Sequence, residues 1–157
     1  MDSDRIPQSD LLEASLRKNK KRIREILQFR VIIESEVAAM AAKRADERDL
    51  RILKKSIQDQ KERISDAQGY FKKDMSFHMS LARAAKNEVF TEVLSVVYDI
   101  LAESRSFSLL SEKRVKTSFE HHLKIIAALE KRDEDGARRL MKDHLDEIDH
   151  QIESEEH

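Results

Sequence analysis

The sequence of 157 residues contains no cysteine and no tryptophan, and it has only 2 glycines, 1 proline and 5% aromatic residues. The absence of cysteine excludes disulfide bonds and thiolate metal ligands. Because glycine and proline are scarce, few residues are available to form turns, and the shortage of aromatic residues disfavours strands. These shortages predict an all-α fold.

The sequence also lacks long apolar runs and an excess of charge of one sign. Lys and Arg total 30 and Asp and Glu total 31, which gives a net charge of -1. No global field therefore attracts nucleic acid or an anionic membrane. No segment approaches the roughly 20 apolar residues of a transmembrane helix, and no signal peptide is visible. We expect one cytoplasmic domain without a membrane partner.

Three segments are predicted along the chain. Residues 1–9 hold the only proline and are expected to form a disordered lead. Residues 10–25 are predicted to form a linker-like basic helix, in which six of the eight residues at 17–24 are Lys or Arg. Contact with phosphate and a solvated helix face are both compatible with this run. Residues 26–154 continue the helical spacing of apolar residues and are predicted to form the packed bundle.

Polar caps predict where the bundle helices begin. Asp46 and Asn87 are expected N-caps, because such side chains accept hydrogen bonds from the first free backbone N–H groups of a helix. The helix after Asn87 carries many apolar residues between Val89 and Leu101. We expect it to be the most buried helix and to lie at the centre of the bundle.

A carboxylate and an imidazole lie four residues apart at Asp74 and His78, within a predicted helix. This spacing places both on one helical face. The rest of that face is apolar, so both groups should point into the interior, where an unpaired charge is costly. His122 and His144 lie on the apolar faces of two later helices and should point inward as well.

Three inward histidines and one inward aspartate predict a divalent metal site. Its ligands would be Asp74, His78, His122 and His144. Imidazole nitrogens and a carboxylate are ligands that Zn, Ni, Mn or Fe accepts, and a helical bundle can bring them together. Three neutral histidines and one carboxylate leave such an ion with about one positive charge, which favours a small carboxylate as a further ligand. The open alternative is a set of hydrogen-bonded core histidines without metal.

Arg30 lies on the inward face of the first bundle helix, one turn before Glu34. Long cations are rarely buried without a partner. An ion pair between Arg30 and Glu34 is one explanation. An arginine aimed at an anionic ligand inside the bundle is the other, and the sequence favours neither.

Four motifs resemble a known family in their order and spacing. The family is the FCD effector domain, the C-terminal ligand-binding domain of FadR-subfamily GntR transcription regulators. The motifs are Arg30-x3-Glu34, Asp74-x3-His78 before Asn87, His121-His122-x2-Ile125, and Met141-x2-His144. The resemblance covers about residues 25 to 150. It implies an antiparallel bundle of about six to seven helices, in which the four predicted ligands hold a divalent ion in a central cavity.

The resemblance also implies roles for individual residues. Effectors in the family are mainly small organic acids. Arg30 matches the arginine of the first helix in the family and Asn87 matches its asparagine, so both are candidate effector contacts. Asn87 keeps its expected role as a helix cap. The spacing to Ile125 and the inward facing both select His122, and not its neighbour His121, as the third ligand.

Members of this family carry a winged-helix DNA-binding domain before the effector domain. We expect it to be absent from this chain, because only a short lead and one basic helix precede the first bundle helix. Residues 26–154 are thus expected to form an effector-binding and dimerisation domain. The expected partners are a small carboxylate, a second copy of the chain, and operator DNA through a DNA-binding domain outside this chain.

No catalytic residue is assigned, because every inward polar group is used as a metal ligand or is Arg30. We therefore expect a regulatory domain and not an enzyme. Two other functions remain open from the sequence. One is a metal-dependent hydrolase or lyase built on a helical bundle, and the other is a metal-free helical interaction module.

Overall fold

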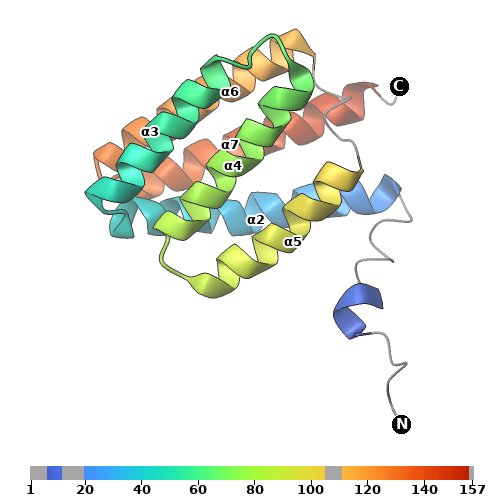
Figure 1. The fold of residues 1–157 in the computed structure, drawn as a ribbon, viewed down its shortest axis with the longest axis horizontal. Coiled ribbons are helices and arrows are strands. Elements are labelled where there is room, and N and C mark those ends of the chain that lie inside the picture. Colours follow the sequence, from blue (N-terminus) through green and yellow to red (C-terminus); the bar gives the residue numbers. More distant parts are fainter. Residues whose placement is uncertain (1–6, 12–19, 105–110, 156–157) are drawn as a thin grey trace.

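The fold is an all-α bundle, seen in a computed structural model that describes residues 7–11, 20–104 and 111–155 (Figure 1). Its helices are α2 (Lys20–Arg44), α3 (Glu47–Lys61), α4 (Ala67–Ala84), α5 (Glu88–Glu103), α6 (Glu112–Glu130) and α7 (Glu134–Glu155). Residues 8–11 are also helical, and the described part of the chain contains no strand. The predicted all-α fold class is confirmed.

The predicted lead and linker lie largely outside the described residues. Residues 1–6 and 12–19 are not described, so the disordered lead and the separate basic helix stay predictions. Residues 20–25, the end of the predicted linker, form the first turns of α2. The first bundle helix therefore includes the last residues of the basic segment.

Local sequence sets where the helices begin. Asp46 and Asp49 form a reciprocal capping box at the start of α3, in which each side chain accepts a hydrogen bond from the other's backbone N–H. The side chain of Asn87 accepts hydrogen bonds from two backbone N–H groups at the start of α5. Ser111 caps α6 in a similar way. The two caps predicted from the sequence, Asp46 and Asn87, are confirmed.

Helix α2 is the central helix of the bundle. It lies along α7 and also contacts α4, α6 and α5 (Figure 1). Its buried face carries Ala38, Ala41 and Ala42, which have no exposed surface. Such small side chains let neighbouring helices approach closely. The same helix buries Arg30 and Glu34, and this places a charged pair inside the bundle.

The expectation that the helix after Asn87 is the most buried and central one is wrong. This helix, α5, packs on α4 and less extensively on α2, at the edge of the bundle (Figure 1). Leu94 and Ile100 are buried, but Val89 is 65% exposed and Val93 is 42% exposed. The helix carries apolar residues on all its sides, whereas the described residues cover only the side that packs on α4 and α2.

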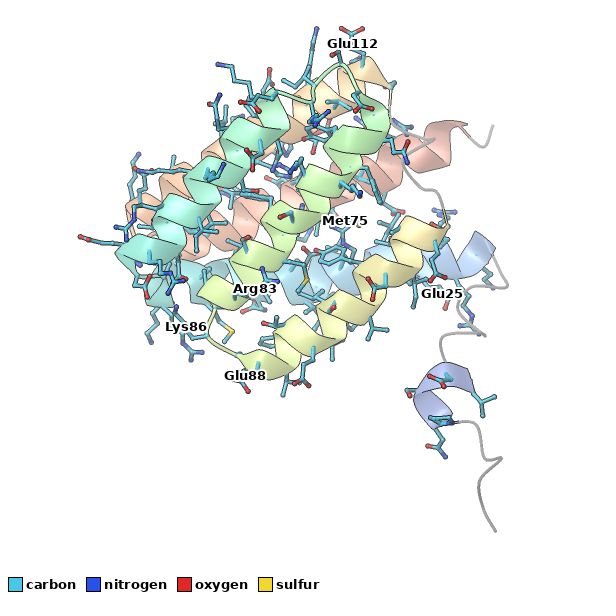
Figure 2. All side chains as sticks on the ribbon, viewed as in Figure 1. Glu25, Met75, Arg83, Lys86, Glu88 and Glu112 are labelled. Atoms are coloured by element: carbon cyan, nitrogen blue, oxygen red, sulfur yellow. The ribbon has the colours of Figure 1, made fainter. Side chains whose placement is uncertain are left out.

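Side chains fill the space between the helices, and charged residues such as Arg83, Glu88 and Glu112 lie on the outside (Figure 2). The interior between α4, α6 and α7 is not wholly apolar. Buried Phe77 and Leu81 lie on the same helix as buried His78. The polar cluster described next is thus enclosed by the hydrophobic core.

Candidate metal centre

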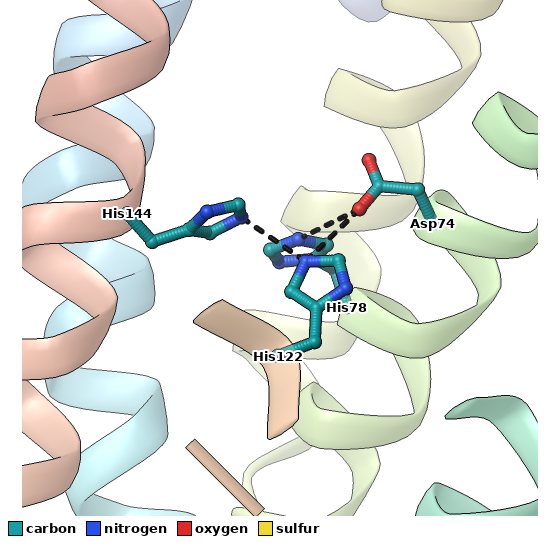
Figure 3. A group of neighbouring side chains, drawn as sticks. All are labelled: Asp74, His78, His122 and His144. Carbon is teal, nitrogen blue, oxygen red and sulfur yellow. Dashed lines mark hydrogen bonds and ion pairs between the residues drawn. The ribbon is translucent and has the colours of Figure 1, made fainter. Parts of the chain in front are cut away.

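Three helices bring the four predicted ligands to one point (Figure 3). Asp74 and His78 lie one turn apart on α4, His122 comes from α6 and His144 comes from α7. One candidate ligand atom from each residue lies within 4.8 Å of the other three. The structure thus brings together all four residues that the sequence singled out.

The spacing of these atoms fits a single small cation. Oδ1 of Asp74 lies 3.1 Å from Nε2 of His122 and 3.4 Å from Nε2 of His78. Nε2 of His122 lies 3.1 Å from Nε2 of His144. Ligand bonds of about 2.0–2.1 Å in a tetrahedron separate neighbouring ligand atoms by about 3.3 Å. The three observed separations are close to this length.

Two buried atoms of the cluster contact only other members of the cluster as ion pairs and form no well-aligned hydrogen bond with the described residues. They are Oδ1 of Asp74 and Nε2 of His78. All three imidazoles are at most 2% exposed, so bulk water does not supply the missing hydrogen bonds. Leaving a buried polar atom without a partner is costly. A cation at the centre of the cluster would bind both atoms, and the residues present therefore fit a divalent metal ion.

The protonation states of three of the four predicted ligands also suit a metal ion. Burial alone would raise the pKa of Asp74, but His78 and His122 outweigh it and hold that pKa well below its usual value. Burial would lower the pKa of His78, but the carboxylates of Glu34 and Asp74 outweigh it and raise the pKa to about 9. The pKa values of His122 and His144 are lowered, chiefly by burial. Asp74 is thus ionised and two of the imidazoles are neutral, as metal binding requires, whereas His78 would release a proton when a metal ion binds.

A second carboxylate supports His78 from α2. Oε1 of Glu34 lies 2.6 Å from Nδ1 of His78. Glu34 also accepts hydrogen bonds from Arg30 and from the hydroxyl of Tyr98. Burial would raise the pKa of Glu34, but Arg30 and His78 outweigh it and lower the pKa to about 2. Since an ionised carboxylate accepts the proton of Nδ1, Nε2 of His78 is the nitrogen presented to the cluster.

A neutral residue supports His122 from α3. Oε1 of Gln60 lies 2.6 Å from Nδ1 of His122, and both side chains have no exposed surface. The hydroxyl of Tyr70 lies 3.5 Å from the same amide oxygen and 3.0 Å from the hydroxyl of Ser118. The ligand cluster is therefore held by side chains from two helices that contribute no ligand themselves.

A cavity of about 80 Å³ adjoins the cluster. Asp74 and His144 form part of its wall, together with Arg30 and Arg114. Its apolar wall consists of Ile23, Leu27, Phe71, Leu101 and Ile148. The cavity thus combines two cationic side chains, two members of the cluster and an apolar surface, a composition typical of sites for small anionic molecules.

Arg30 forms the ion pair with Glu34 that one explanation predicted, and it also lines the cavity. It is only 6% exposed, and its Nε donates a hydrogen bond to Glu34. Its guanidinium lies 5.0 Å from the centre of the Tyr98 ring. Its terminal nitrogens form no hydrogen bond with the described residues, and the side chain lines the cavity. Arg30 is therefore an ion-pair partner that still has donors to offer to an anion.

Two other residues considered from the sequence lie outside the cluster. Asn87 caps α5 and is not part of the cavity wall, so its location does not match the role of effector contact. Nε2 of His121 lies 3.1 Å from Glu147, and this histidine side chain is 20% exposed. His122, by contrast, is fully buried in the cluster. The choice of His122 over His121 agrees with the geometry.

Two supporting residues were not recognised from the sequence, although each leaves a signal there. Gln60 follows Ile57 by three residues on the buried stripe of α3, and a polar residue on such a stripe indicates a buried hydrogen bond. Arg114 precedes Ser118 and His122 at intervals of four residues, and all three are buried on α6. A buried cation two turns before a buried histidine is a second such signal.

Known proteins resemble this chain in sequence. The sequence model of the FCD domain matches residues 25–147. The chain is 27% identical to the Uxu operon regulator of Haemophilus influenzae, over 79% of this chain and 48% of that protein. It is also 27% identical to the HTH-type transcriptional regulator LutR of Bacillus subtilis, over 90% of this chain and 67% of that protein. The HTH-type transcriptional repressor NanR of Cronobacter sakazakii is 27% identical over 77% of this chain and 47% of its own length.

Solved structures share the fold. Streptococcus agalactiae GntR superimposes with a TM-score of 0.76 at 21% identity, covering 85% of this chain and 61% of that one. Escherichia coli McbR/YncC superimposes with a TM-score of 0.72 at 15% identity, covering 83% of this chain and 67% of that one. At these identities the likeness concerns the fold alone.

The helical bundle encloses a polar cluster and a cavity. Its relatives are named as transcription regulators, so it is a regulatory domain and not an enzyme. The chain belongs to the FCD domain family, the effector-binding domains of GntR-family transcription regulators. It spans about half the length of the Uxu operon regulator and of NanR. Within its described residues, no helix is long and apolar enough to cross a membrane.

Proposed function

We propose that this FCD domain senses a small organic acid at a divalent metal ion. The residues that would hold the ion are Asp74, His78, His122 and His144. The ion, which would be Zn, Ni, Mn or Fe, supplies positive charge that attracts an anion. The observation that carries the proposal is a shared wall, because Arg30, Asp74 and His144 line the same cavity.

Arg30 binds and orients the acid. A guanidinium offers parallel N–H donors that match the two oxygens of a carboxylate. Glu34 engages Nε of Arg30, which fixes the guanidinium and leaves its terminal nitrogens for the ligand. The apolar wall formed by Leu27, Phe71 and Ile148 contacts the hydrocarbon part of the acid. A cavity of about 80 Å³ restricts the ligand to a small molecule.

Binding of the acid changes the population of bundle conformations. The cavity wall includes residues of α2, α4, α6 and α7, so the acid favours the arrangement in which these helices enclose it. The relatives are HTH-type regulators, which supports a cytoplasmic homodimer whose DNA-binding domains lie outside this chain. A shift in the effector domain then alters the spacing of two DNA-binding domains.

Thermal unfolding in the presence of a panel of small mono-, di- and hydroxycarboxylates tests the proposal. At least one acid should raise the melting temperature of the Zn²⁺-loaded protein, since a ligand that binds only the folded state stabilises it. The rise should disappear in R30Q and persist in R22Q, which changes an exposed arginine of the same helix. No rise with any acid, or a rise that persists in R30Q or without metal, would overturn it.

A further inference from the structure

We infer that Gln60 is a positioning residue that fixes the ring of His122 so that Nε2 faces the metal ion. The inference rests on the proposed function, because it concerns one of the four proposed ligands. Gln60 lies on α3, a helix that contributes no ligand, and it has no exposed surface. Its role is therefore exerted through His122 and not through contact with the ion.

The hydrogen bond between the two side chains sets the tautomer of the imidazole. Oε1 of Gln60 lies 2.6 Å from Nδ1 of His122. An amide oxygen can only accept, so Nδ1 carries the proton, and a neutral imidazole has only one. Nε2 of His122 is then left with a lone pair, which points toward Asp74 and His144.

The orientation of the Gln60 amide decides which nitrogen of His122 carries the proton. With the amide reversed, its NH2 group would donate to Nδ1 and the single proton of His122 would move to Nε2, where it would block metal binding. The hydroxyl of Tyr70 favours the observed orientation, since it lies 3.5 Å from Oε1 and can donate to an oxygen there. The Ser118 hydroxyl lies 3.0 Å from the same phenolic oxygen and can donate its own proton to it, which leaves the single proton of Tyr70 for Oε1.

The NH2 group of the Gln60 side chain argues against a purely structural role for this residue. Nε2 of Gln60 is buried and has no hydrogen-bond partner in the described part of the chain. An unsatisfied buried amide lowers stability, so a residue selected only for stability would be apolar here. In metal-free protein, loss of the Gln60 oxygen is tolerable, because His122 can place its proton on Nε2, 3.1 Å from the carboxylate of Asp74.

Substitution of Gln60 by methionine or by glutamate separates a role in positioning His122 from a purely structural role. Q60M keeps the size of the side chain but removes the acceptor, and it should weaken Zn²⁺ binding by about 10- to 100-fold. Q60E restores an acceptor and should bind Zn²⁺ about as tightly as the wild type. Q58M changes an exposed glutamine of the same helix and serves as the matched control. Zn²⁺ affinity is measured by competition with a chromophoric chelator.

Two further measurements exclude a general loss of structure. The melting temperature of metal-free Q60M should equal or exceed that of the metal-free wild type. In ¹⁵N-edited NMR spectra of the Zn²⁺-loaded wild type, the Nδ1 proton of His122 should be protected from exchange, and Q60M should lose this protection. Equal Zn²⁺ affinity of wild type and Q60M, or failure of Q60E to restore it, would overturn the role of Gln60 alone. Absence of Zn²⁺ binding by the wild type would overturn the proposed function as well.

Discussion

Each imidazole of the cluster is fixed by a different neighbour. Nδ1 of His78 faces the carboxylate of Glu34, whereas Nδ1 of His122 faces the neutral amide of Gln60. The ring of His144 stacks on that of His78, with centroids 5.6 Å apart and an interplanar angle of 14°. Because the supports differ in charge and in kind, the ligands are not interchangeable, and substitutions must be tested one by one.

Adjacent histidines on α6 provide a sharp comparison. H122A should abolish stoichiometric Zn²⁺ binding, because it removes a buried ligand at the centre of the cluster. H121A should leave binding intact, since His121 pairs with Glu147 near the surface. Equilibrium dialysis followed by elemental analysis measures both. Equal losses of Zn²⁺ binding in H122A and H121A would contradict the assignment of His122, and not His121, to the cluster.

The buried charge of Glu34 should matter for stability. E34L leaves the guanidinium of Arg30 buried without its carboxylate, and we expect the free energy of unfolding to fall by about 3–5 kcal/mol. E36L changes an exposed glutamate of the same helix, which pairs with Arg138 of α7, and should change the free energy of unfolding by less than about 1 kcal/mol. Urea denaturation of both variants, in metal-free form, gives the comparison. Similar small effects would contradict a buried charge network at Arg30.

At the scale of the helix, the sequence predicted what depends on near neighbours. The caps Asp46 and Asn87 were correct, because capping involves residues only two or three positions away. The burial of α5 was predicted wrongly, because burial depends on which other helices cover it. Val89 and Val93 belong to an apolar helix and are nonetheless exposed, since among the described helices α5 packs mainly on α4 and less extensively on α2.

Asn87 offers a test of its own role at the start of α5. N87A removes the side-chain acceptor for two backbone N–H groups and should lower the free energy of unfolding by about 1 kcal/mol. The acid-induced rise in melting temperature of the Zn²⁺-loaded protein should be unchanged, because Asn87 does not line the cavity. Loss of that rise in N87A would instead identify Asn87 as an effector contact.

At the scale of the whole molecule, the cluster links distant parts of the chain. Glu34 and His78 are 44 positions apart, and Gln60 and His122 are 62 positions apart. The four proposed ligands could be selected from their inward facing and from a family resemblance. The burial of Gln60 and Arg114 left a signal on the apolar faces of α3 and α6. The cavity and the contact of Gln60 with His122 could not be predicted, because they arise from packing between helices, which has no period in the sequence.

The metal content of tag-free protein, measured by elemental analysis before and after chelation, tests the central claim most directly. We expect one divalent ion per chain. We also expect its removal to lower the melting temperature, because an ion that binds only the folded state contributes about 2.7 kcal/mol at a concentration 100 times its Kd. Protein that stays free of metal after exposure to Zn²⁺, Ni²⁺, Mn²⁺ and Fe²⁺, with a melting temperature that chelator does not change, would contradict the claim. The three buried histidines would then be structural residues of the core.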